Sequence, residues 1–229
     1  ARGLAIDPRT TGLLEVQPAS PHENYVERTW KLAIDANGDA RITLESRADG
    51  AFRAFLEGPA GKMIDGEELS ERLLSNCASL GIDPDELDIE GPKRHPDGLW
   101  SYQASFVWMD ALARFGDLRV LELPPLPLLE LLAAVTPVRV SRFLPGSVRQ
   151  NIRMEALHHR LVLAPAAVEL SNPVGSIRTS VEPGEFTTRM SLEFLLRGVE
   201  ADQERQQEWL RLRKALHRAL SPDFVLSPD

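Results

Sequence analysis

The sequence contains one cysteine, Cys77, and no apolar run long enough to cross a membrane. A single cysteine excludes an internal disulfide framework. A membrane-spanning helix would need about 18 or more apolar residues in succession, so no span is expected. The chain also lacks the glycine-rich Walker loop, the Gly-x-Ser-x-Gly elbow and the His-Glu-x-x-His motif. It therefore carries none of the short motifs that mark P-loop nucleotide binding, serine hydrolysis or zinc proteolysis.

Positive charge is scarce, because 26 Lys and Arg residues stand against 34 Asp and Glu residues and the net charge is -8. The excess of acids lies entirely in residues 1–120, which hold 21 acidic and 13 basic residues, whereas residues 121–229 hold 13 of each. An acidic protein repels phosphate backbones. Nucleic acid is therefore not an expected partner.

The stretch 25–46 predicts a β-hairpin. Asn37 and Gly38 tolerate a positive φ and mark the turn. Apolar residues alternate with polar ones on both sides of this turn, at Val26, Trp30, Leu32, Ile34, Ile42 and Leu44.

A second hairpin is predicted over residues 176–196, with its turn at Pro183 and Gly184. Its inner face would be lined by Phe186, Met190, Leu192, Phe194 and Leu196. Strict alternation also predicts a half-buried strand over 100–108, with Trp100, Tyr102, Ala104, Phe106 and Trp108 on one face. Residues 112–123 indicate one or two more strands, and residues 224–226 a final one.

Over residues 150–165 the alternation of apolar and polar residues changes phase midway. Ile152, Met154 and Ala156 share one parity, and the apolar positions then switch to Leu157, Leu161 and Leu163. Such a switch within one strand predicts a β-bulge near His158.

Helical patterns are fewer than strand patterns. Residues 66–80 have Leu69, Leu73, Cys77 and Leu80 at helical spacing, with Asp65 and Glu68 forming a capping-box pattern. Residues 202–220 present Trp209, Leu212, Leu216 and Leu220 on one side and predict a C-terminal helix. Short helices are expected over 49–58, ending at Gly58, and within 124–137, while 83–92 is expected to be a solvated acidic loop.

These patterns predict a mainly β (α+β) fold, with antiparallel, β-sandwich-like sheets and a few amphipathic helices, including the C-terminal one. Residues 1–23 read as a segment lying against a surface. Residues 24–229 are expected to form one β-rich domain, with two subdomains divided near residue 95 as the alternative.

Few side chains suggest chemistry. Cys77 lies late in an amphipathic helix, on its apolar stripe and near acids that would raise its thiol pKa, so we expect a buried structural residue. His158 and His159 are adjacent in a predicted strand and would face opposite sides, which disfavours a shared metal ion. We therefore expect no catalytic residue, no metal site and no cofactor.

The sequence nevertheless resembles one family. The stretch "GLAIDPRTTGLLEVQPASPHENYVERTWKLAIDANGDARITLESRADGAFRAF" is similar to the junction that follows the catalytic core of bacterial transglutaminase-like proteins, of the papain-like thiol superfamily. "RFLPGSVRQNIRMEALHHRLVLAP" resembles a later β segment of the same domain, although Leu163-Ala164-Pro165 departs from the usual Leu-Pro pair. The final hairpin and helix also match, with Trp209 where tyrosine is more usual.

The resemblance implies a domain of uncharacterised function that follows the catalytic core. The family's catalytic cysteine, histidine and aspartate would lie upstream of Ala1, and Cys77 does not have the catalytic cysteine's context. Residues 1–23 would lead out of that core, with Leu4, Ile6, Leu13 and Leu14 as a docking surface for it. An extracytoplasmic bacterial location is also implied.

Three functions follow as hypotheses. The first is a non-catalytic accessory domain that supports the core of a transglutaminase-like acyltransferase or peptidase, or binds its protein substrate. The second is a stand-alone β-sandwich module for peptides or glycans, which would require an exposed aromatic row at Trp100, Tyr102, Phe106 and Trp108. The third is a metal-dependent hydrolase that uses His158 or His159.

Overall fold

The computed structural model describes residues 2–3, 14–15, 20, 23–57, 62–79, 82–122, 145–197, 203–219 and 223–228. Most of these residues lie in strands, which form one sheet of eight strands, one of four and one short pair, β1 (Arg2–Gly3) with β2 (Leu14–Glu15). The predicted mainly β fold with antiparallel sheets and a C-terminal helix is confirmed.

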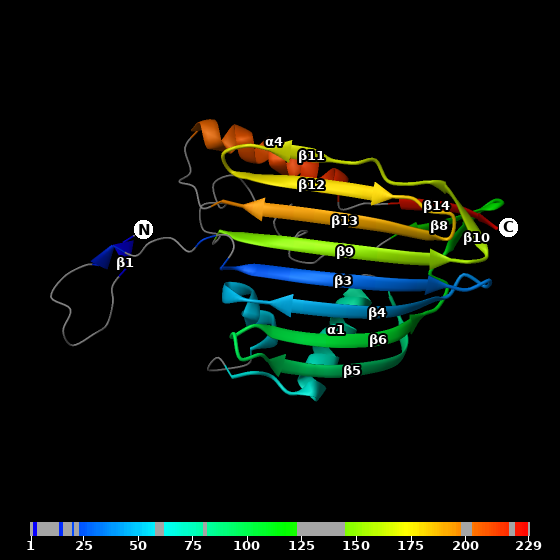
Figure 1. Ribbon diagram of the computed structural model, residues 1–229, viewed down its shortest axis with the longest axis horizontal. Coiled ribbons are helices and arrows are strands. Elements are labelled where there is room, and N and C mark those ends of the chain that lie inside the picture. The colour runs from blue at the N-terminus through cyan, green and yellow to red at the C-terminus, as the bar shows by residue number, and fades with distance from the viewer. Residues whose placement is uncertain are drawn as a thin grey trace.

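The large sheet organises the molecule (Figure 1). Its neighbours are antiparallel except at the centre, where β3 and β9 run parallel. In spatial order its strands are β11 (Glu169–Ser171), β12 (Gly175–Glu182), β13 (Thr187–Leu196), β9 (Gly146–Ala156), β3 (Tyr25–Ile34), β4 (Ala40–Ala48), β6 (Trp100–Trp108) and β5 (Pro84–Arg94).

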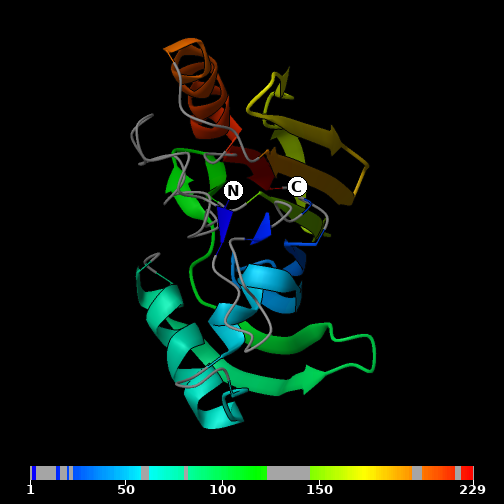
Figure 2. The same ribbon diagram turned by 90° about the vertical axis from the view of Figure 1, so that its left-hand side faces the viewer.

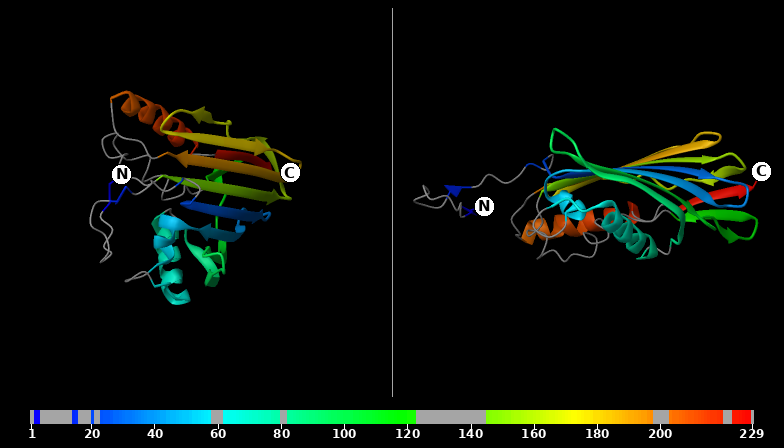
Figure 3. Two further views of the ribbon diagram at one scale, coloured as in Figure 1. Left: turned by 60° about the vertical axis from the view of Figure 1, so that its left-hand side comes forward. Right: turned by 90° about the horizontal axis from the view of Figure 1, so that it is seen from below.

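The described helices and the four-stranded sheet all cover the same face of this large sheet (Figures 2 and 3). The covering elements are η1 (Gly50–Leu56), α1 (Gly66–Ser79), α4 (Gln203–Ala219) and a four-stranded sheet of β10 (His159–Leu163), β14 (Asp223–Pro228), β8 (Leu118–Glu122) and β7 (Ala113–Phe115). Alternate residues of the central strands are buried beneath them, and the residues between point to the opposite, open face.

Two apolar clusters fill the covered side. Beneath β3, β4 and β6 lie Leu69 and Leu73 of α1 together with Phe224 of β14. Beneath β12 and β13 lie Trp209 and Leu212 of α4, both with 0% exposure. The helical stripes predicted from the sequence therefore form the contacts between helix and sheet.

The first hairpin is confirmed, but its turn differs in detail. β3 and β4 pair from Val26–Ala48 to Ile34–Ala40. Of the two predicted turn residues only Gly38 has a positive φ, at 100°. The Asp35 carboxylate accepts the backbone N–H groups of Asn37, Gly38 and Asp39 at 2.8, 3.0 and 3.1 Å, so a side chain closes this turn.

The cap of α1 is also confirmed. Asp65 Oδ1 accepts the backbone N–H of Glu68 at 2.9 Å. The Glu68 carboxylate, however, binds the Arg72 guanidinium at 2.7 Å, one turn along the helix. Leu80 and Leu220, predicted at the ends of the two helical stripes, lie outside the described residues, as do Gly58 and residues 124–137.

The predicted acidic loop over 83–92 is wrong, because it is the edge strand β5. Leu87 and Ile89 pack against the core. The acidic residues around them remain exposed, at Asp85, Glu86, Asp88 and Glu90. The pairing of β5 with β6 shifts register twice, after Asp85 and after Glu90. Acidic side chains and bulges on an edge strand prevent further strand pairing.

The predicted bulge near His158 is also wrong. Leu157 and His158 form a turn through which the chain leaves the large sheet, and His159 begins β10 of the small one. The change of apolar parity therefore marks a change of sheet. Of the second parity only Leu161 packs against the first apolar cluster, whereas Leu157 and Leu163 are 63% and 60% exposed.

The second hairpin is confirmed with one exception. β12 and β13 pair from Gly175–Leu196 to Glu182–Arg189, and the turn includes Pro183 and Gly184. Phe186, predicted on the inner face, is 44% exposed in the turn. A boundary near residue 95 would fall in the turn between β5 and β6, two paired strands of one sheet.

The close approach of β12 to β13 and α4 gives a test of this packing. A Cβ added at Gly175 would lie 2.3 Å from the Leu195 carbonyl oxygen and 2.9 Å from a methyl group of Leu212. Gly175→Ala is therefore expected to lower the free energy of unfolding by about 1–3 kcal/mol in urea denaturation. Gly66→Ala is the control, because its Cβ meets nothing closer than 3.5 Å. An equal loss in both variants would contradict this packing.

Candidate functional site

The docking surface predicted at the N-terminus falls almost entirely outside the described residues. Leu4, Ile6 and Leu13 lie outside the described residues, and only the strand backbone of Leu14 is described, paired with Gly3.

Cys77 is half-buried and packs against the interior beneath the sheet. It contacts the first apolar cluster and lines a cavity of about 30 Å³ together with Trp30, Leu73 and Phe106. Burial raises the pKa of the Cys77 thiol. The predicted direction is right, but the cause is desolvation and not nearby carboxylates. A thiol with a raised pKa is mostly protonated at neutral pH, which makes it a poor nucleophile.

The aromatic row on β6 is buried, which contradicts the requirement of a glycan platform. Trp100, Tyr102 and Phe106 are each 4% exposed, and Trp108 packs against the same cluster. Its alternation with polar residues reflects one covered and one open face of the sheet.

The two adjacent histidines diverge. His158 is exposed in the turn after β9, whereas His159 is 4% exposed at the start of β10. Both line a hollow of about 600 Å³ at the end of the sheet near the C-terminus, with Asp39 and Arg114. Within the described ranges, no three His, Cys, Asp or Glu side chains are placed to hold a metal ion. The arrangement gives the metal-hydrolase hypothesis no support.

The open face of the large sheet carries a row of charges that alternate in sign from strand to strand. Each member lies directly opposite the next in the strand register. We call it the charge row, and it consists of Glu169, Arg178, Glu193, Arg149, Glu27 and Arg47, on β11, β12, β13, β9, β3 and β4 in turn.

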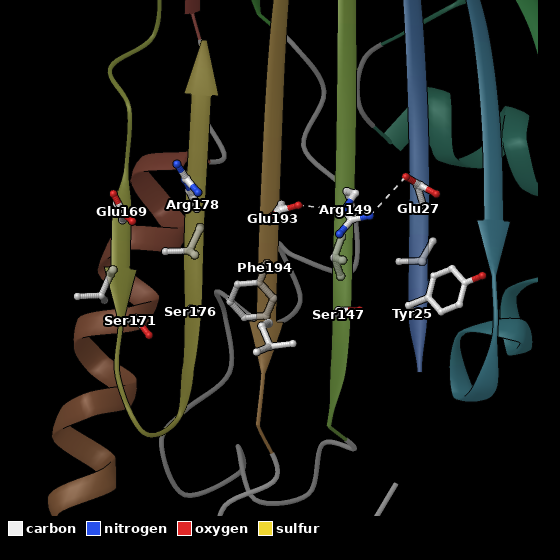
Figure 4. Close-up of a pocket in the computed structure, with 15 residues that line it drawn as sticks. Tyr25, Glu27, Ser147, Arg149, Glu169, Ser171, Ser176, Arg178, Glu193 and Phe194 are labelled. Carbon is white, nitrogen blue, oxygen red and sulfur yellow. Dashed lines mark hydrogen bonds and ion pairs between the residues drawn. The ribbon is translucent and has the colours of Figure 1, made fainter. Parts of the chain in front are cut away.

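Arg149 holds the centre of the charge row (Figure 4). Its Nε lies 3.0 Å from Glu193 Oε1, and its Nη1 lies 4.0 Å from Glu27 Oε1. These side chains are between one third and nearly three fifths exposed, so each pair adds at most about 1 kcal/mol to stability. Because these ion pairs are weak and exposed to water, their charged groups remain available to a partner.

A hollow of about 640 Å³ lies beside the charge row. The floor of the hollow is the next row of open-face residues, two positions along each strand from the charge row. This row carries mostly small side chains, and Tyr25 lies at one end of it (Figure 4). Burial, and then the charge of Asp49, raise the pKa of the Tyr25 phenol. The small side chains of the floor are Ser147, Ser171 and Ser176.

A second level of the open face places three cations side by side. Arg189 on β13 is opposite Arg153 on β9, which is opposite Lys31 on β3. Glu155 lies 2.6 Å from Arg153, and Glu45 lies 2.8 Å from Lys31. We call Arg189, Arg153 and Lys31 the basic triad.

Sequence reasoning missed the whole open face. Its residues were visible as the polar positions of the alternating strands, and the apolar positions were used to find those strands. The charge row depends on which strands are neighbours, and the pairing of β3 with β9 joins positions more than 110 residues apart. No local signal in the sequence reports that pairing.

The arrangement on the open face suits recognition more than catalysis. The described lining of the hollow offers carboxylates, guanidinium groups and hydroxyls, which hydrogen-bond to polypeptide backbone and to polar side chains. No helix in the described part of the chain is long and apolar enough to cross a membrane.

The raised pKa of Cys77 predicts a pH dependence of stability. An unfolded chain loses the thiol proton at a lower pH than the folded chain, so the contribution of Cys77 is full below the unfolded pKa and falls as pH rises through the folded pKa. The difference in unfolding free energy between the wild type and Cys77→Ala is therefore expected to shrink from pH 7 to pH 10, measured by urea denaturation. A constant difference would show that the thiol is solvated.

The comparison with known proteins adds no relative. No protein-family model matches the chain, and no curated protein sequence matches it. The arrangement of the open face therefore has to be interpreted from its own geometry.

Proposed function

We propose that the chain is a non-catalytic accessory domain that binds protein through the open face of its large sheet. The observation that carries the proposal is the charge row beside a hollow of about 640 Å³, on a face that no other described element covers. The resemblance to the domain that follows the core of transglutaminase-like proteins suggests the partner: the catalytic core, or the protein substrate on which that core acts.

Polypeptide is the ligand class that this surface favours. Opposite charges next to one another can pair with both signs on a partner, and seryl hydroxyls both donate and accept hydrogen bonds. Glycans usually require an exposed aromatic surface, and the row that would supply it is buried. The acidic net charge disfavours nucleic acid.

The accessory role is consistent with the position of the chain's one thiol. Cys77 is half-buried against the core on the covered side, whereas the hollow and the charge row lie on the open side. A thiol-dependent reaction would then belong to another domain of the same polypeptide, upstream of Ala1, as the resemblance implies.

A binding experiment tests the proposal. The reading frame upstream of Ala1 is expected to encode a transglutaminase-like core, which is produced separately and titrated with this chain by isothermal calorimetry. Arg149→Glu places a third carboxylate between Glu27 and Glu193 and is expected to weaken binding about tenfold or more.

Lys214→Glu on α4 is the matched control, because Lys214 is exposed and lies on an element that covers the other face. It has the same change of charge as Arg149→Glu and is expected to leave binding unchanged. The proposal fails if the upstream frame encodes no such core, or if both variants bind the core as the wild type does.

A further inference from the structure

We infer that the open face pairs with the open face of a second copy of this chain, as a two-fold symmetric, sheet-on-sheet dimer. The inference rests on the proposed function only in treating this face as a protein-binding surface. It names a partner for that surface, and the partner is argued from the strand register.

The spacing of the charges indicates the kind of surface that fits. The charge row changes sign at every strand, which is about every 4.8 Å. Residues on one side of a single extended peptide repeat at about 6.8 Å, so a peptide laid across the strands falls out of step with the row. A second β-sheet with strands along the same direction has the matching repeat.

A two-fold axis parallel to the strands, midway between β3 and β4, brings two such faces together. It places β3 over the partner's β4, β9 over the partner's β6, and β13 over the partner's β5. Rotation about this axis keeps each residue's position along the strands. Each residue therefore faces a partner residue from the same row of paired residues, and the facing pairs follow from the strand pairing alone.

On the level of the charge row, this axis sets acids against bases. Its six positions from β13 to β5 are Glu193, Arg149, Glu27, Arg47, Ser101 and Lys93. Glu27 faces the partner's Arg47, and Glu193 faces the partner's Lys93. Arg149 faces the partner's Ser101.

The level of the basic triad is matched as well. Its six positions are Arg189, Arg153, Lys31, Thr43, Ser105 and Asp88. Arg189 faces the partner's Asp88, while Arg153 and Lys31 face hydroxyl groups, the partner's Ser105 and the partner's Thr43. No two like charges meet on either level.

Other axes do not have this property over as much of the sheet. Moving the axis one strand toward β13 sets Arg153 against the partner's Lys31, and moving it two strands sets Arg189 against the partner's Arg153. Moving it toward β5 reduces the overlap to four strands. The axis one strand toward β13 overlaps all eight strands but carries the Arg153–Lys31 clash, so the axis between β3 and β4, with six strands, gives the largest overlap without facing like charges.

The size of the face is sufficient for a dimer. Six strands at about 4.8 Å and nine residues at about 3.4 Å give roughly 880 Å² per copy. A standard stable interface covers about 800 Å² per partner. Facing sheets cross at about 30° because of strand twist, so the pairs nearest the axis are aligned best. The long side chains of Arg and Lys can follow the displacement of the outer pairs.

Asp88 and Arg189 provide the sharpest test. Both are exposed, and they lie five strands apart in one copy, or about 24 Å. A rescue between them therefore cannot arise within a monomer. Sedimentation velocity at about 0.15 M salt is expected to show a reversible dimer of the wild type, weakened about tenfold by Asp88→Arg and by Arg189→Asp, with the double variant returning to within about threefold of the wild type.

Net charge alone predicts a different pattern. Asp88→Arg lowers the net negative charge and Arg189→Asp raises it, so a general repulsion would strengthen the first dimer and weaken the second. Lys214→Glu serves as the control on α4 and is expected to leave the dimer intact. Circular dichroism of each variant checks that it is folded.

A wild type that stays monomeric up to about 1 mM, or a dimer that survives both single reversals, would overturn the inference. So would a double variant that remains as weak as the single ones. A monomer that still binds the upstream core through Arg149 would overturn the dimer and leave the proposed function standing. A dimer without affinity for that core would do the reverse.

Discussion

The parallel pairing of β3 with β9 is the constraint on which the rest of the structure depends. Ten consecutive residue pairs, from Tyr25–Ser147 to Ile34–Ala156, join the two halves of the chain into one sheet. The apolar clusters cross the same junction, because Val26 packs with the α4 cluster while Ile152 and Met154 belong to the α1 cluster. Neither half could bury these side chains without the other half beside it.

The same pairing creates the open face. Since α1, α4 and the small sheet all lie on one side, the eight strands have one dry surface and one wet surface. The wet surface is in contact with water, and its polar residues keep it hydrated. The two edge strands of the sheet are protected against further strand pairing in different ways. β5 carries acids and two irregularities in register, and β11 is only three residues long.

The sequence predicted what is local. The hairpins, the cap at Asp65 and the stripes of α1 and α4 depend on neighbours within about twenty residues, and alternation or helical spacing reports them directly. Longer-range features were missed or misread. The acids of β5 look like a loop because an edge strand keeps only a weak apolar pattern, and the change of sheet after Ala156 looks like a bulge. The open face was missed because its order depends on the β3–β9 pairing.

Alternating charges alone would not mark a binding surface, because opposite charges on neighbouring strands stabilise any exposed sheet. The basic triad is different. Arg189, Arg153 and Lys31 lie opposite one another on three adjacent strands, and like charges in that relation destabilise the pairing. Acids of the same chain offset part of this repulsion, because Glu155 lies 2.6 Å from Arg153, Glu45 lies 2.8 Å from Lys31, and Glu182 is opposite Arg189. A facing surface that supplies acidic and hydroxyl groups would offset the remaining repulsion, and the proposed dimer places such groups opposite the basic triad.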